Sequence, residues 1–219
     1  MNRFGAVVLF IICVGMIVWA SAWQLVDVKG ALARQAMAEW YRTGSIDALN
    51  SWGRAEQQLQ DAVGMNPFSS ERYLALGNLY EWRAVGVGMA SQDEKQHRTR
   101  ATQYYRNALR LRPSWTLVWT SLAINKALAG DLDDELSKAI IRSLHSEPWN
   151  LEIQRRAILA AMLAWEELPE MTRESVFVAV RRAIGQSQDD RLLRNMAMQY
   201  GLEWRWEKIR ASSRVSDSS

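Results

Sequence analysis

The sequence has little of what most catalytic and metal sites are built from. Its 219 residues include one cysteine, Cys13, so a disulfide, a CxxC redox pair or a thiolate zinc site cannot form within one chain. There are two histidines and no HExxH, glycine-rich phosphate loop or G-x-S-x-G motif. The formal charge of +3 lacks the clustered basic excess of nucleic-acid-binding domains. We therefore expect no catalysis, no cofactor or metal, and no nucleic-acid partner.

Charged residues are missing from one stretch of 20 residues near the N-terminus, Phe4 to Trp23. A helix of this length rises about 30 Å, which matches the hydrocarbon core of a bilayer. Trp19 and Trp23 lie at its far end, where amphipathic rings favour the membrane interface, and Arg3 precedes it. We predict a single-pass anchor, residues 1–25, in the inner (plasma) membrane. The N-terminus would be cytoplasmic and the C-terminal domain periplasmic or otherwise extracytoplasmic.

The same stretch has a second interpretation. Ala20-Ser21-Ala22 matches the small-residue pattern of a signal-peptide cleavage site, so the segment could be removed after export. We favour the uncleaved anchor, because the apolar run is long and only one basic residue precedes it. Both interpretations deliver residues 24–219 to the same side of the membrane, and the mass of the mature N-terminus separates them.

A spacing pattern recurs three times in the remaining sequence. Each copy has small or apolar side chains at offsets 0, 4 and 7 and a proline at offset 12. The first three offsets share one helix face, where small side chains let another helix approach closely, and proline cannot continue a helix. Such repetition is typical of a solenoid, in which each unit packs against the next. The copies are Ala55, Leu59, Ala62 and Pro67; Ala101, Tyr105, Ala108 and Pro113; and Leu136, Ile140, Ser143 and Pro148.

A partner helix precedes the second and third copies. Together with the spacing pattern, its residues resemble the tetratricopeptide repeat (TPR), a pair of antiparallel helices in about 34 residues. Residues 70–115 match throughout, with an insertion, and Gly77 leaves room for a neighbouring helix. In residues 116–150, Lys126 and Leu136 replace the usual tyrosine and alanine, so we expect less regular packing there. Residues 31–69 form an earlier unit, whose first helix is assigned by position. The partner-helix residues are Tyr73, Leu76, Gly77 and Tyr80, then Trp119, Leu122, Ala123 and Lys126.

Beyond residue 150 the helical period continues without the repeat pattern. Solenoids need atypical terminal units that cover the open end, so we assign residues 151–210 to degenerate capping helices. The polar residues 211–219 are predicted to be disordered. The resemblance therefore implies an all-α fold, in which an N-terminal transmembrane helix precedes a short TPR-like α-solenoid of antiparallel helix pairs over residues 26–210.

Several side chains of the middle repeat are predicted to face a partner. Asn78, Glu81 and Trp82 follow the helix face that lines the concave groove of TPR proteins, as the resemblance implies. The insertion, Arg83 to Arg98, is expected to form a surface loop, and Met89 within it offers an adaptable apolar contact. A surface loop without a function is the alternative for this segment.

Charged side chains supply the other candidates. The acidic run Asp133 to Glu135 is interpreted as the start of a helix, and His145 as a cation near a helix end. Arg106 and Arg110 belong to a basic run, which favours either an anionic partner (a glycan, a lipid head group or a protein) or a plain solvated helix face. We expect Arg106→Glu and Arg110→Glu to leave folding intact. The basic run comprises Lys95, Arg98, Arg100, Arg106, Arg110 and Arg112.

Helical repeats of this kind present a curved surface to another protein or peptide, so we expect a membrane-anchored interaction scaffold. In outline the chain also resembles the VpsP-like polysaccharide biosynthesis proteins of bacteria. It shares with them one N-terminal span, few repeats and a closing segment LPEMTRESVFVAVRRAI followed by RLLRNMAMQYG. That resemblance implies a role in exopolysaccharide assembly or export, with envelope polysaccharide machinery as partner. Two alternatives are open: a periplasmic adaptor for protein maturation or envelope-complex assembly, and a glycan-binding module that uses Trp82 and the basic run.

Overall fold

Helices dominate the part of the chain that the structure describes. The structure, a computed structural model, covers residues 12–14, 16, 31, 35, 37–40, 42, 49–86, 92–185 and 187–215. These residues contain no β-strand, which confirms the predicted all-α class. The helices are α2 (Leu49–Met65), α3 (Ser70–Gly86), α4 (Gln92–Leu111), α5 (Thr116–Ala129), α6 (Asp134–Ser146), α7 (Leu151–Leu163), α8 (Glu170–Ile184), α9 (Ser187–Gln199) and α10 (Glu203–Val215), with a 3-10 turn η1 (Trp165–Glu167) after α7.

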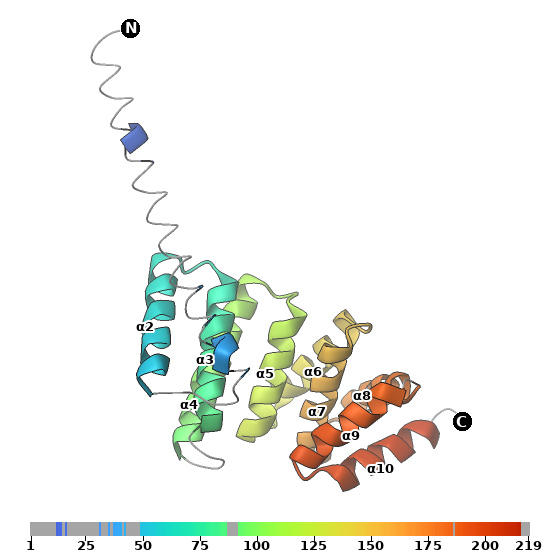
Figure 1. Cartoon of the computed structure of the whole chain (residues 1–219). Helices are drawn as coiled ribbons and strands as arrows, with labels where there is room; N and C mark the ends of the chain where they lie inside the picture. The colour runs from blue at the N-terminus through green and yellow to red at the C-terminus, as the bar shows by residue number, and fades with distance from the viewer. Residues whose placement is uncertain are drawn as a thin grey trace, which may run out of the picture.

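Consecutive helices pair side by side, and the pairs stack in a row (Figure 1). The pairs are α3 with α4, α5 with α6, α7 with α8 and α9 with α10. Helices α3, α5, α7 and α9 contact one another in succession and form one layer, whereas α6, α8 and α10 contact one another in the other layer. Helix α5 is central, because it contacts α3, α4, α6 and α7. The arrangement is the solenoid-like stack that the repeat pattern predicts.

The residues of the spacing pattern form the contacts between these helices. Each proline lies two residues after a helix: Pro67 after α2, Pro113 after α4 and Pro148 after α6. Of the partner-helix residues, Tyr73 and Trp119 are half-buried, and the Trp119 Nε1–H donates to the carbonyl oxygen of Pro113 at 2.7 Å. The buried pattern and partner-helix residues are Ala55, Leu59, Ala62, Leu76, Tyr80, Ala101, Tyr105, Ala108, Leu122, Ala123, Lys126, Leu136, Ile140 and Ser143.

Gly77 of α3 lies directly against the Tyr105 ring of α4. A Cβ atom built at Gly77 would lie 2.3 Å from Tyr105 Cε1, well inside van der Waals contact. Tyr105 has no exposed surface, so packed neighbours on all sides keep the ring in place. The close approach of α3 and α4 therefore depends on the missing side chain at Gly77.

The insertion is mostly helical, which corrects the predicted surface loop. Helix α3 runs to Gly86 and α4 begins at Gln92, so helix occupies most of the segment from 83 to 98. Glu94 and Arg98, four residues apart in α4, form a buried ion pair with Arg98 Nε 2.7 Å from Glu94 Oε1. Such a pair at i and i+4 favours helix over loop. Met89 lies outside the described residues.

Helix α10 extends into the predicted disordered tail. Residues 211–215 are helical, so the prediction is wrong for them, while residues 216–219 lie outside the described part of the chain. Trp206, Ile209 and Ser213 share one face of α10 and have no exposed surface. Arg181 of α8 donates from Nη1 to the carbonyl oxygen of Ser213 at 3.2 Å. Burial of this face is what orders the end of the chain.

The first unit is described only in part. Residues 31, 35, 37–40 and 42 are helical, within the range assigned by position to its first helix. Met37 and Trp40 are buried in a cluster with residues of α2 and α3. The predicted anchor, residues 1–25, lies outside the described residues except for 12–14 and 16. Among the helices that the structure describes, none is long and apolar enough to cross a bilayer.

Replacing Gly77 with alanine should lower the free energy of unfolding by about 1–3 kcal/mol, the usual cost of overpacking a buried contact. Urea unfolding followed by circular dichroism measures this change. Gly53→Ala in α2 is the matched control, because no atom lies within 4 Å of a Cβ built there. It should raise the stability by about 0.5–1 kcal/mol through helix propensity alone. Equal effects of the two substitutions would contradict the close contact between α3 and α4.

Candidate interaction surface

The three predicted contact residues of α3 are half-buried, and two of them are tied to α4. The Tyr105 hydroxyl donates to the Glu81 carboxylate, with 2.6 Å from Tyr105 Oη to Glu81 Oε2, and lies 3.0 Å from Asn78 Oδ1. The third, Trp82, follows Glu81 on the same helix. The polar ends of Asn78 and Glu81 therefore stabilise the α3–α4 pair.

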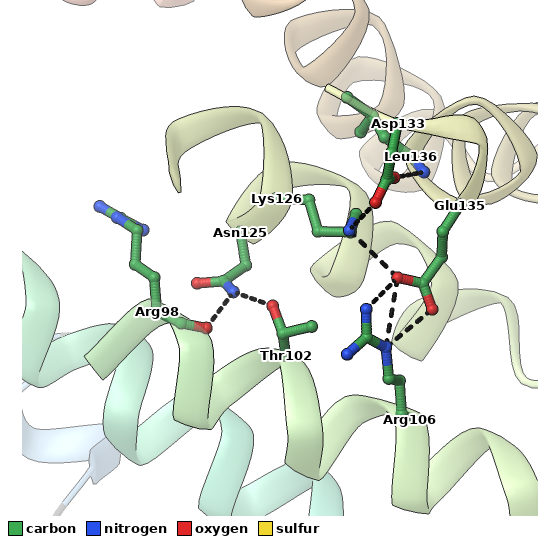
Figure 2. A network of polar contacts seen from close by, with 8 residues as sticks. All are labelled: Arg98, Thr102, Arg106, Asn125, Lys126, Asp133, Glu135 and Leu136. Carbon is green, nitrogen blue, oxygen red and sulfur yellow. Dashed lines mark hydrogen bonds and ion pairs between the residues drawn. The ribbon is translucent and has the colours of Figure 1, made fainter. Parts of the chain in front are cut away.

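An ion-pair network joins α4, α5 and α6 (Figure 2). The Lys126 side chain of α5 is 2% exposed, and its Nζ lies 2.8 Å from Asp133 Oδ2 and 3.1 Å from Glu135 Oε2. Arg106 of α4 donates to the same Glu135 carboxylate, from Nη2 to Oε2 at 2.6 Å and from Nε to Oε1 at 2.9 Å. Asp133 also accepts a hydrogen bond from the Leu136 backbone N–H at 3.0 Å and so caps α6. One carboxylate, that of Glu135, thus bridges cations from two other helices.

This network changes the interpretation of three sequence features. The acidic run does open a helix, as predicted, because α6 begins at Asp134 with Asp133 as its cap. Lys126, which was expected to loosen the packing, is buried and neutralised by two carboxylates. Arg106 is paired with Glu135, so Arg106→Glu would set two carboxylates against each other. This pairing leads us to expect that the reversal lowers the stability of the fold.

Both carboxylates of the network are held in the ionised form. The hydrogen bonds from Arg106 lower the pKa of Glu135 against the effect of partial burial, and Lys126 lowers it further. At Asp133 partial burial raises the pKa, but the bonds from Lys126 and the Leu136 N–H outweigh it, so the pKa is lowered overall. A carboxylate whose pKa is lower in the folded state stabilises the fold above the ordinary carboxyl range near about pH 4. That contribution is lost as the pH falls through the folded-state pKa.

Neutral hydrogen bonds join α4 and α5 beside the ion pairs (Figure 2). Asn125 of α5 has no exposed surface, and its Nδ2 donates to the carbonyl oxygen of Arg98 at 2.8 Å and to Thr102 Oγ1 at 2.9 Å. Arg98 is itself buried and ion-paired with Glu94 in the same helix. Because buried polar groups are costly when unpaired, these bonds fix the register of α5 against α4.

Four aromatic rings gather between α2, α3 and α4. The centroid of the Tyr80 ring lies 5.4 Å from that of Trp52, 5.9 Å from His97 and 5.5 Å from Tyr104. The Tyr80 hydroxyl donates to the Glu56 carboxylate. His97 comes from the insertion, so this segment contributes packing to the repeat, and we call these four residues the aromatic cluster.

The aromatic cluster favours the neutral forms of its titratable members. Burial, followed by the hydrogen bond to Glu56, raises the pKa of Tyr80 to about 12. Burial also lowers the pKa of His97, and the neighbouring positive charges of Arg83 and Arg100 lower it further. A protonated His97 therefore destabilises this part of the fold.

The remaining basic residues differ in their surroundings. Arg110 is exposed and donates to Asn107 Oδ1 at 3.1 Å within α4, whereas Arg106 is engaged with Glu135 and Arg98 is buried. His145 lies exposed in the last turn of α6, near the helix end where the sequence places it. Within the residues that the structure describes, no group of three or more His, Cys, Asp or Glu side chains is placed to hold a metal ion.

No protein-family model matches this chain, and no curated protein matches it at a significant level. The resemblances to TPR and VpsP-like proteins therefore rest on the residues quoted above.

Removing the two acids around Lys126 should destabilise the fold much more than removing the lysine. Asp133→Asn combined with Glu135→Gln keeps a capping side chain but leaves the buried ammonium without a counter-charge, at a cost of about 3–5 kcal/mol in unfolding free energy. Lys126→Met leaves carboxylates that are 54% and 30% exposed and can be hydrated. Its cost should be about 1.5 kcal/mol or less, as for other swaps of similar volume.

Urea unfolding at pH 7 and pH 3 measures both effects. The gap between the wild type and the double variant should shrink at pH 3, because protonation removes the same carboxylate charges from the wild type. A double variant that is as stable as the wild type at pH 7 would show that the network contributes nothing.

The free energy of unfolding should also fall between about pH 7 and pH 5 because of His97. Its folded-state pKa is lowered, so its contribution is complete above the unfolded-state value of about 6.5 and is lost as the pH falls through the folded-state pKa. His97→Gln should flatten the pH dependence in this window. His145→Gln, at the exposed end of α6, is the control and should keep the slope. If His145→Gln flattens the pH dependence and His97→Gln does not, His97 is excluded as the cause.

Proposed function

We propose that this chain is a membrane-anchored protein-interaction scaffold of the TPR type, with no catalysis of its own. The observation that carries the proposal is the continuous stack of helix pairs (Figure 1). Such a stack presents an extended surface composed of side chains from several helices, which suits a protein or peptide partner. The proposed function is to bind a protein or peptide partner and hold it in position.

Hydrogen bonds and ion pairs between helices support the proposal of a rigid scaffold. The Tyr105 hydroxyl links α4 to α3, and the Lys126 network links α4, α5 and α6. Farther along, Arg205 of α10 donates to the carbonyl oxygen of Met162 in α7 at 2.7 Å. A surface that is ordered before binding loses little conformational entropy when a partner binds.

The layer of α3 and α5 is the surface that we assign to the partner. Trp82 of α3 and the α5 residues Leu117 and Leu128 are half-buried, so each keeps part of an apolar side chain accessible. Aromatic and aliphatic groups of this kind dominate the energetics of protein interfaces. Arg110 on α4 adds an exposed positive charge to the scaffold.

Two parts of the proposal come from the sequence: the anchor from the uncharged stretch Phe4 to Trp23, and the pathway from the VpsP-like resemblance. A membrane anchor at residues 1–25 would raise the effective concentration of the scaffold near membrane machinery. The VpsP-like resemblance supports exopolysaccharide biosynthesis or export as the process. An adaptor for protein maturation or envelope-complex assembly is the alternative with the same binding role.

Site-specific photo-crosslinking of the full-length chain in its own cells tests this proposal. The photoreactive residue p-benzoylphenylalanine replaces Trp82 on α3 or Leu128 on α5. Arg142 is the matched control, because it is exposed on α6 in the other helix layer. Irradiation should give an adduct of one discrete mass at the first two positions and none at Arg142. No adduct at any position, or the same adduct at all three, would contradict a partner surface on α3 and α5.

A further inference from the structure

A pocket of about 290 Å³ opens between the start of α7 and the end of α8. It lies outside the residues that the repeat pattern marks for binding. Its walls are mostly apolar and include Ile158 of α7 and Ala179 of α8. Trp149, in the turn between α6 and α7, borders the pocket with 86% of its surface exposed. A large aromatic side chain is thus held beside an apolar cavity and is not covered by the fold.

Gln154 is one of the residues that line the pocket, and its side chain carries a buried acceptor. The residue is 6% exposed, and its Nε2 donates to the carbonyl oxygens of Leu144 at 3.1 Å and Glu147 at 3.2 Å near the end of α6. These bonds fix the amide group, which leaves Oε1 buried without a hydrogen-bond donor among the described residues. A buried unpaired acceptor costs about 1–3 kcal/mol, so a bound N–H or O–H group would be favoured at this position.

The pocket also carries positive charge. Arg155 and Arg182 line it beside the N-terminal turn of the 13-residue α7, where Glu152 offsets the positive end of the helix dipole. Arg182 is exposed, and its hydrogen bonds go to the carbonyl oxygens of Pro148 at 3.1 Å and Val178 at 3.5 Å. It forms no ion pair with any acid in the described part of the chain. The acid of the adjacent turn, Glu147, accepts instead from Asn150 Nδ2 at 2.9 Å.

We propose that this pocket binds an acidic peptide segment of a partner protein. An aliphatic side chain of the segment enters the pocket against Trp149 and Ile158, and a neighbouring Asp or Glu carboxylate pairs with Arg182. A backbone N–H of the segment supplies the donor for Gln154 Oε1. The inference rests on the proposed function, because it gives the scaffold a second contact with a partner and states the chemistry of that contact.

A peptide fits the pocket better than an acidic sugar does. The apolar walls suit an aliphatic side chain, whereas a sugar ring would place hydroxyl groups against Ile158 and Ala179, where they lose their hydrogen bonds to water. A peptide provides the aliphatic group, the carboxylate and the N–H donor within two adjacent residues. The three groups match the apolar wall, Arg182 and Gln154 respectively.

Fluorescence anisotropy with the full-length chain in neutral phosphatidylcholine nanodiscs tests the inference directly. The probe is the fluorescein-labelled heptapeptide GEELEEG, compared with GQQLQQG and GEEGEEG, which lack its charges and its aliphatic side chain. The protein variants are Arg182→Gln and Trp149→Ala, both at exposed residues, and the matched charge control is Arg142→Gln on α6. Circular dichroism establishes that each variant is folded.

GEELEEG should bind saturably, and both Arg182→Gln and the change to GQQLQQG should weaken binding about tenfold, the effect of losing one charge-assisted hydrogen bond. Trp149→Ala and the change to GEEGEEG should also weaken it, whereas Arg142→Gln should not. Affinity should fall as salt is added. The inference is overturned if GEELEEG shows no saturable binding up to millimolar concentrations, or binds wild type and Arg182→Gln alike. It is also overturned if an oligogalacturonate binds in place of the peptides and is lost in Arg182→Gln.

The crosslinking experiment separates this inference from the proposed function. A photoreactive residue in place of Leu151, which lines the pocket and is 39% exposed, should give an adduct with the same partner. Adducts at Trp82 and Leu128 without one at Leu151 would overturn the pocket assignment and leave the scaffold proposal standing. The absence of adducts at all three positions would overturn both.

Discussion

The rest of this structure depends on how closely neighbouring helices can pack against one another. Buried alanines at the pattern positions, such as Ala55, Ala101 and Ala108, keep side-chain volume small where helices meet. Gly77 is the extreme case, because the Tyr105 ring occupies the space that a Cβ atom would fill. The ring position in turn brings the Tyr105 hydroxyl to Glu81, so one steric constraint also fixes a polar tie between α3 and α4. The stack, and any surface that it offers to a partner, follows from these contacts.

Where the repeat pattern becomes irregular, polar side chains connect the neighbouring helices. Lys126 stands where the pattern has a tyrosine, and a buried ammonium is tolerated only with counter-charges nearby. Asp133 and Glu135, at the start of the next helix, supply them, and Arg106 adds a third helix to the same network. The ion pairs at this one irregular position thus connect α4, α5 and α6. Removing the two carboxylates there should disturb three helices at once, because both the Lys126 ammonium and the Arg106 guanidinium lose their partner.

The sequence predicts well which residues pack between neighbouring helices. It predicts poorly the polar network that connects α4, α5 and α6. Helical periodicity and side-chain size determine where helices can meet, so residues such as Ala101 could be assigned before the structure. The Lys126 network depends on the path of the turn between α5 and α6, which spacing alone does not specify. Surplus length in the repeat predicts a loop at the insertion, and this prediction is wrong because Glu94 and Arg98 are spaced as a helical ion pair. The pocket beside Trp149 combines the ends of two helices, and no local motif marks it.

Residue-resolved hydrogen exchange of the full-length chain tests most directly whether the stack is one rigid scaffold. If the contacts around Gly77 and Lys126 join the helices as described, the slowest amides of α3, α4, α5 and α6 should share one opening free energy and respond to urea together. Amides of α3 and α4 that open at a clearly lower free energy than those of α5 and α6 would contradict the account. The pairs would then be independent units, and the surface across α3 and α5 would not be preformed.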